Sequence, residues 1–126
     1  MKRVIAAFAL ILTAVAVTVW TDYVFEKEMN TFEKELNGLV DVSDKADEKE
    51  LLERAETVVF QWEKSSSLLR SIVLHSGIDE LGRSITSLPQ VIEHSGKEEM
   101  KTVCIEAVNM IKNLKECETL NIENIL

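Results

Sequence analysis

The chain has 126 residues, with 14 lysines and arginines against 22 aspartates and glutamates, and its formal net charge at pH 7 is −8. All the acidic residues follow Thr21, whereas two basic residues precede it, so the segment from Thr21 onward carries a net charge of −10. A segment this acidic repels phosphate, which argues against nucleic acid and anionic lipid headgroups as partners. It leaves three interpretations, namely a solvated helix surface, a cationic protein partner and metal cations.

The composition also bounds the fold class. The chain has one proline and four glycines, far below average usage, which favours an all-α fold with short loops. About a hundred residues remain once an N-terminal anchor is set aside, which is enough for one small domain.

The first predicted element is an uncharged apolar run, Val4–Trp20, preceded by Lys2 and Arg3. A transmembrane helix needs about 20 mostly apolar residues, and Trp20 and Tyr23 stand where interfacial aromatic residues are expected. Positive charge stays on the cytoplasmic side. The sequence therefore predicts a single-pass cell-membrane anchor over residues 1–25, a cytoplasmic N-terminus and an acidic extracytoplasmic domain over residues 26–126.

A cleaved signal peptide is the alternative to an anchor, because Ala14-Val15-Ala16 matches an A-x-A cleavage pattern. The apolar run continues past this site to Trp20, where a cleavage region normally becomes polar, and this favours the uncleaved anchor. Cleavage near Ala16 would instead release a secreted helical protein that acts in the cell wall.

Apolar residues spaced alternately four and three apart predict one helix face after another. The first helix continues beyond the membrane with the stripe Phe25, Met29, Phe32, Leu36 and Leu39. A polar turn over Asp41–Asp47 follows, in which Ser43 or Asp44 is expected to cap the next helix. The second helix is predicted over about Asp47–His75, with Trp62 as its core anchor and Leu69 on the same face, and Gly77 is expected to end it.

The third predicted helix carries Ile78, Leu81 and Ile85, and Pro89 is expected to kink it or end it early. The fourth is predicted over about Lys97–Glu118, and the tail Leu120–Leu126 is expected to lie extended along the bundle. The predicted architecture is a transmembrane helix that continues into a small antiparallel bundle of about four helices in total. Its core is expected to include Trp62, Leu69, Ile78, Leu81 and Ile85.

Candidate chemical sites are few. Cys104 and Cys117 lie thirteen residues apart on one predicted helix, so their Cα atoms are about 20 Å apart and a disulfide within the chain would require that helix to break. Buried thiols are expected instead, with a disulfide between two chains as the alternative. His75 with Asp79, and His94 with Glu98, have metal-ligand spacing, but a glycine interrupts each pair and zinc needs three or four ligands.

The Ser65-Ser66-Ser67 run has no general base or oxyanion element around it, which favours a close helix crossing over a nucleophile. The sequence thus predicts no catalytic residue, no metal site and no cofactor.

Several short motifs carry a resemblance to a known family. They are Gln61-Trp62, His75, Ile78-Asp79, Ser84-Ile85, Leu88, Ile92-Glu93 and the ending Leu120-Asn121-Ile122-Glu123-Asn124-Ile125-Leu126. With the N-terminal anchor, they make the chain resemble the domain of unknown function 4363 family, which comprises short membrane-anchored helical proteins of clostridia and related Firmicutes. The resemblance implies this topology and a helical fold, and a membrane partner, but no activity.

The chain departs from the family pattern at three positions, since Leu74 and Gly77 stand where family members carry acidic residues, and Pro89 replaces a helix-forming residue. The leading hypothesis is a non-enzymatic interaction or accessory module for another membrane or envelope protein, or one that self-associates. A metal- or ligand-binding domain is a further alternative. The candidate interaction residues are His75, Asp79, Asn121, Glu123 and Asn124.

Overall fold

The computed structural model describes residues 1–72 and 75–125, without the side chains of His75 and of residues 118–125. This part of the chain forms five helices and no strands. The helices are α1 (Lys2–Val42), α2 (Glu48–Ile72), α3 (His75–Thr86), α4 (Leu88–Ser95) and α5 (Lys97–Ile125). The predicted all-α fold, with a long apolar N-terminal helix, is confirmed.

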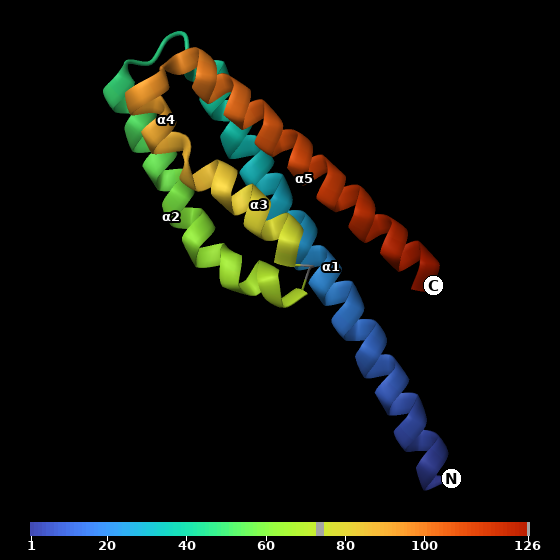
Figure 1. Ribbon diagram of the computed structural model, residues 1–126. Helices are drawn as coiled ribbons and strands as arrows, with labels where there is room; N and C mark the ends of the chain where they lie inside the picture. Colours follow the sequence, from blue (N-terminus) through green and yellow to red (C-terminus); the bar gives the residue numbers. More distant parts are fainter. Residues whose placement is uncertain (73–74, 126) are drawn as a thin grey trace.

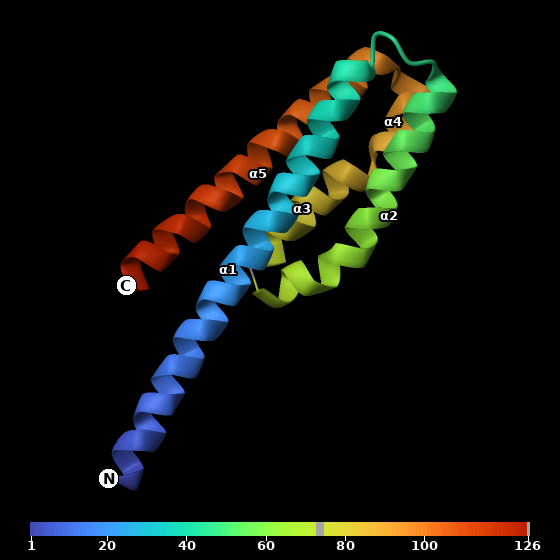
Figure 2. The ribbon, with the colours of Figure 1, turned by 180° about the vertical axis from the view of Figure 1, so that it is seen from behind.

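The helices form an antiparallel bundle with four segments (Figure 1). α1 packs against α2 and α5, and α3 and α4 together fill the opposite position, also between α2 and α5. Seen from behind, α5 returns along α1 toward the N-terminal end of the molecule (Figure 2). The chain therefore runs up, down, up and down, which is the arrangement that short loops between neighbouring helices favour.

One continuous core joins the five helices. α1 contributes the predicted stripe from Phe25 to Leu39, and each of its members is at most 2% exposed. At the centre, the rings of Phe32 and Trp62 meet edge to face with centroids 5.2 Å apart, a favourable geometry for aromatic pairs. The predicted core residues Leu69, Ile78, Leu81 and Ile85 are fully buried, and Trp62 is 2% exposed.

The caps between α1 and α2 differ from the prediction. Asp47, rather than Ser43 or Asp44, caps α2, and its Oδ1 accepts the backbone N–H of Glu50 at 2.8 Å. Ser43 instead follows the end of α1, where its hydroxyl donates to the Val40 carbonyl at 2.7 Å. Asp47 and Glu50 have the spacing of a capping box, which satisfies amides that the first helical turn leaves free.

Pro89 ends the third predicted segment early. α3 stops at Thr86, and α4 begins at Leu88 with the proline in its first turn, where the missing N–H has no helical partner to lose. α4 then closes at Gly96, whose φ of 85° suits glycine at a helix end.

Two other boundaries were wrong. Gly77 does not end α2, which stops at Ile72, but lies inside α3, where it faces Leu114 of α5. The tail is not extended, because α5 continues to Ile125 without a glycine or proline to stop it. Leu126 lies outside the described residues.

Candidate functional site

The largest exposed apolar surface of the protein is the N-terminal half of α1. No residue in its most apolar 18-residue window is buried, although the helix is long and apolar enough to cross a membrane. A core helix of a soluble protein would be mostly buried, so this segment is not packed as one. Exposed apolar surface of this extent is typical of a membrane or protein contact, and an N-terminal signal sequence has the same character.

Burial begins within two turns of α1. Trp20 and Tyr23 are 56% and 64% exposed, whereas Phe25 is 1% exposed and lies in the core. The helix is continuous through this border. Phe25, which the sequence assigned to the anchor segment, thus packs with the bundle.

A groove of about 740 Å³ runs between α2 and α3. It is open to solvent and mostly polar, and its floor includes Trp62 and Gly82. Its other lining residues are Glu63, Ser66, Ser67, Arg70, Asp79, Arg83 and Thr86. The groove thus holds two basic residues, Arg70 and Arg83, and two acidic residues, Glu63 and Asp79, so its charges balance in a protein whose net charge is −8.

The predicted interaction residue Asp79 lies in this groove. Its Oδ1 accepts a hydrogen bond from Nε of Arg70 at 3.0 Å, which links α3 to α2. Both side chains are about half exposed, so the pair contributes at most about 1 kcal/mol to stability. The neighbouring Arg83 is exposed.

Gly82 allows α3 to approach the indole of Trp62. A Cβ atom at position 82 would lie 2.8 Å from Nε1 of Trp62 and 3.2 Å from two of its ring carbons. An aromatic ring packed on both sides has little freedom to move, so the glycine sets the separation between α2 and α3 beneath the groove.

Gly82→Ala is expected to destabilise the fold by about 1–3 kcal/mol, because the added methyl group overpacks the indole contact. The measurement is the urea midpoint of the full chain in detergent, followed by circular dichroism. Gly38→Ala is the matched control, since a Cβ there meets nothing within 4 Å. This control is expected to raise stability by about 0.5–1 kcal/mol through helix propensity, and equal changes in both variants would contradict the packing argument.

The other candidate interaction residues lie in two places. His75 begins α3, and Asn121, Glu123 and Asn124 lie in the last turns of α5, but their side chains are outside the described part. Of the five residues, Asp79 is the one whose side chain is described, and it lies in the groove.

Of the two histidine–carboxylate pairs with metal-ligand spacing, His75 with Asp79 rests on a side chain outside the described part. His94 is exposed at the end of α4, and Gly96 separates it from Glu98 in the first turn of α5. Among the side chains that the structure describes, in residues 1–72 and 76–117, no three histidine, cysteine, aspartate or glutamate residues lie close enough together to hold a metal ion.

The serine run joins helices. Ser65 Oγ donates to Oε2 of Glu28 on α1 at 2.9 Å, and Ser66 Oγ donates to the carbonyl of Glu63 one turn back. The first of these bonds agrees with the expected close crossing of α2 with another helix.

The two cysteines are free and differ in environment. Cys104 is fully buried, and burial raises the pKa of its thiol to about 12, whereas Cys117 is exposed. Because the thiolate is the reactive form, maleimide at pH 7 is expected to label Cys117 in the folded protein and Cys104 only after unfolding. Intact mass counts the labels, and a native Cys117→Ser variant that still takes one label would contradict this assignment.

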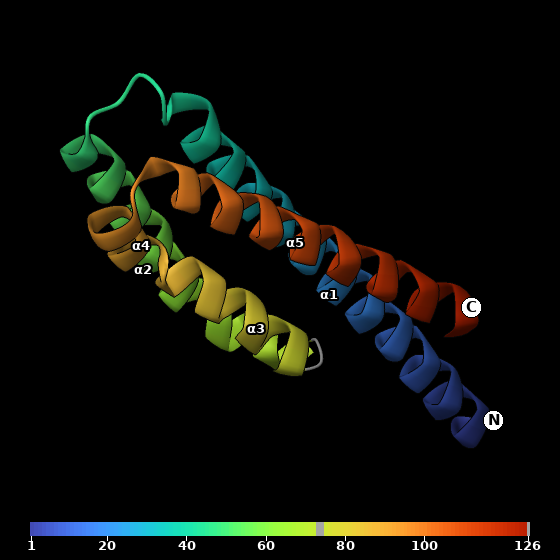
Figure 3. The same cartoon turned by 45° about the horizontal axis from the view of Figure 1, so that its top comes forward.

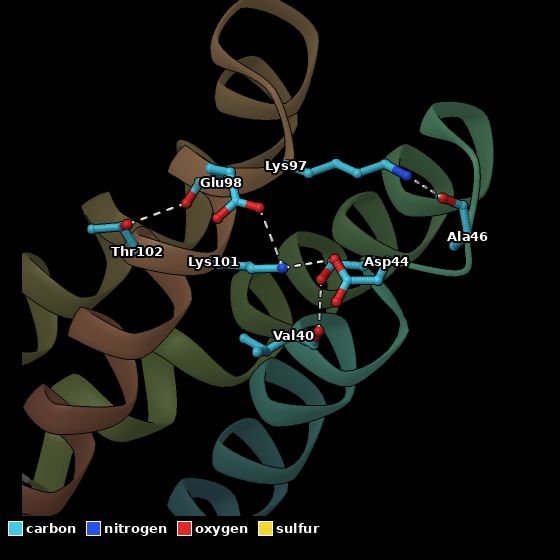
Figure 4. Close-up of polar contacts among 8 residues, drawn as sticks. Val40, Asp44, Ala46, Lys97, Glu98, Lys101 and Thr102 are labelled. Atoms are coloured by element: carbon cyan, nitrogen blue, oxygen red, sulfur yellow. Dashed lines mark hydrogen bonds and ion pairs between the residues drawn. The ribbon is translucent and has the colours of Figure 1, made fainter.

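A group of polar contacts lies at the end of the bundle farthest from the N-terminus (Figure 4). The sequence did not predict these contacts. Lys97 Nζ donates to the Ala46 carbonyl at 2.8 Å, and Lys101 Nζ lies 2.7 Å from Oδ1 of Asp44 and 3.4 Å from Glu98. The hydrogen bond from Lys101 lowers the pKa of Asp44, and the same bond raises the pKa of Lys101. These contacts hold the α1–α2 connection against the start of α5.

A second unpredicted contact joins α5 to α1 nearer the apolar half of α1. Lys115 Nζ lies 2.8 Å from Oε2 of Glu33 and also donates to Oδ1 of Asn30. The side chains of Lys115 and Glu33 are only about one-fifth exposed, so water screens this pair less than a pair on the open surface.

Comparison with known proteins gives one match. No curated protein and no solved structure matches the chain. A protein-family model with the description "Domain of unknown function (DUF4363)" matches residues 19–125, which extend from the end of the exposed apolar run to the end of α5. On this match over most of its length, the chain belongs to the DUF4363 family.

Proposed function

We propose that the protein is a single-pass, membrane-anchored helical module that docks on another membrane or envelope protein and has no catalytic activity of its own. The observation that carries this proposal is α1, whose apolar N-terminal half is uncovered while the rest of the same helix forms one wall of the bundle. An anchor and a folded module thus share one unbroken helix.

The charge distribution supports an orientation for this anchor. Lys2 and Arg3 directly precede the apolar run, whereas Asp22 and Glu26 directly follow it. Because basic residues stay on the cytoplasmic side, we place the N-terminus in the cytoplasm and the bundle outside.

The groove between α2 and α3 is the surface that we assign to docking. It presents the exposed Arg83, and arginine is enriched where protein partners bind. A partner segment that carries a carboxylate would complement Arg83, because Arg70 already pairs with Asp79, and the acidic surface around the groove would disfavour misplaced contacts.

Affinity purification from detergent-solubilised membranes tests this assignment. The full chain carries a C-terminal tag, and a stoichiometric companion is expected to co-elute with it. Arg83→Glu is expected to lose this companion, because it reverses a charge in the groove. Lys112→Glu makes the same charge change on an exposed residue of α5 and is expected to retain it. A companion that both variants retain equally would overturn the groove as the docking surface.

A secreted cell-wall protein is the second candidate. Cleavage after Ala16 would remove only exposed residues and would leave the whole buried stripe of α1, which begins at Phe25. The intact mass of the protein purified from cells decides between the two candidates. A mass that includes residues 1–16 eliminates the secreted form, and a mass that lacks them eliminates the anchor.

A further inference from the structure

α2 and α5 both end beside the same part of α1. Ser65 of α2 bonds to Glu28 of α1 at 2.9 Å, and α2 runs antiparallel to α1 until it ends at Ile72. Ile72 is seven residues beyond Ser65, or about 10 Å along the helix. The end of α2 therefore lies beside about residue 21 of α1. Figures 1 and 2 show α2 ending where α1 leaves the bundle.

α5 reaches about the same height from the other side of α1. The pairing of Lys115 with Glu33 and Asn30 sets its register, and the helix continues for ten residues to Ile125, or about 15 Å. Antiparallel packing then brings the end of α5 level with the border between Trp20 and Tyr23. Figure 3 shows α5 lying along α1 within the bundle and diverging from it toward this end.

The ends of α2 and α5 therefore lie level with the part of α1 in which exposed side chains give way to buried ones. Trp20 and Tyr23 are exposed, and Phe25 is the first core residue. The residues from Val4 to Trp20 span about 25 Å, close to the thickness of the hydrocarbon layer. With this run in the bilayer, no length of bare helix remains between the lipid and the bundle.

We infer that the end of the bundle nearest the apolar run, formed by the last turn of α2, the start of α3 and the last turn of α5, rests directly on the lipid headgroups. This inference rests on the proposed membrane anchor. The occupant of this surface is a zwitterionic lipid face, because Asp22 and Glu26 flank the border on α1 and would repel anionic headgroups.

The contact restricts what can enter the docking groove. Arg70 lies two residues from the end of α2, and Trp62 lies ten residues from it, which is about 15 Å along the helix. With the end of α2 on the headgroups, the groove between α2 and α3 lies within about 15 Å of them. Its partner is accordingly the juxtamembrane segment of another membrane protein.

Depth-dependent fluorescence quenching tests the lipid contact on the full chain in phosphatidylcholine vesicles. Cys117 is replaced by serine, and single cysteines replace Ser71 at the end of α2 or Lys45 in the α1–α2 connection, both of which are exposed. Each receives a thiol-reactive fluorophore, and the vesicles contain lipids with a headgroup-level quencher. Buried Cys104 does not compete for the label.

The label at position 71 is expected to lose severalfold more fluorescence than the label at position 45. A third variant, Thr18→Cys, reports on the anchor alone, because position 18 lies in the apolar run. Quenching at position 18 without quenching at position 71 would overturn the lipid contact and leave the anchor standing. Absence of quenching at position 18 would overturn the anchor and the lipid contact with it.

Discussion

Trp62→Ala is expected to destabilise the bundle by about 3–5 kcal/mol, the largest effect of any single side-chain truncation in this core. The indole is 2% exposed, meets the ring of Phe32 edge to face and lies against Gly82, so its removal leaves a cavity that three helices line. Small domains are stable by about 5–15 kcal/mol in total, and the variant is expected to be partly unfolded at 37 °C.

Urea unfolding of the full chain in detergent, followed by circular dichroism, measures this loss. Phe60→Ala is the matched control on the same helix, because the Phe60 side chain is 56% exposed and its ring pairs with Lys64 Nζ, which lies 4.4 Å from the ring centroid. Its truncation is expected to change stability by less than about 1 kcal/mol. Similar losses in the two variants would show that Trp62 does not anchor the core.

Leu12→Arg is expected to move the protein out of the membrane fraction. Leu12 lies at the middle of the apolar run and is 55% exposed, so it does not contribute to the bundle core. An arginine at the centre of a transmembrane helix costs about 2.5–3.5 kcal/mol in membrane insertion. The measurement is the share of protein that remains in carbonate-washed membranes.

The control for this variant adds the same charge outside the apolar run. Asn109→Arg changes an exposed residue of α5 and is expected to leave the membrane fraction unchanged. The purified bundle of either variant should unfold at the wild-type urea concentration, because neither position is buried. A Leu12→Arg protein that stays fully in washed membranes would argue against the anchor.

The helical fold and most of its core were predictable, because the spacing of apolar residues along the sequence indicates which face of each helix is buried. The stripe from Phe25 to Leu39 and the core positions Trp62, Leu69, Ile78, Leu81 and Ile85 all follow from this period. Pro89 likewise predicts a helix end, since it lacks the N–H that a continuing helix needs.

The residues at which helices begin and end were harder to predict, because several neighbouring residues are equally suitable as caps or stops. Ser43, Asp44 and Asp47 are all good cap residues, and only Asp47 has Glu50 three positions later to complete a capping box. Gly77 looks like a helix stop in sequence, but its role is to make room for Leu114 of α5, which is 37 residues away. The tail alternates apolar and polar residues, yet the preceding helix simply continues through it.

The groove could not be predicted from local pattern. Arg70 and Asp79 are nine residues apart on different helices, and nothing in their spacing shows that a helix reversal brings them together. The same holds for Lys101 with Asp44 and Lys115 with Glu33, whose partners lie 57 and 82 residues away. Such pairs depend on the register between helices, which the buried side chains set only once the bundle is packed.

Because α1 is unbroken, the bundle and the apolar half of α1 are expected to move together as one rigid body. No glycine or proline interrupts the helix between Val4 and Met29, so there is no hinge at the border. Under the proposed anchoring, a tilt of the transmembrane half tilts the groove by the same angle. A helix longer than the hydrocarbon layer tilts to fit it, whereas an apolar run of about 25 Å is shorter than an average layer and is accommodated by local thinning of the bilayer. The short run would therefore leave the groove at a nearly constant angle to the membrane when bilayer thickness changes.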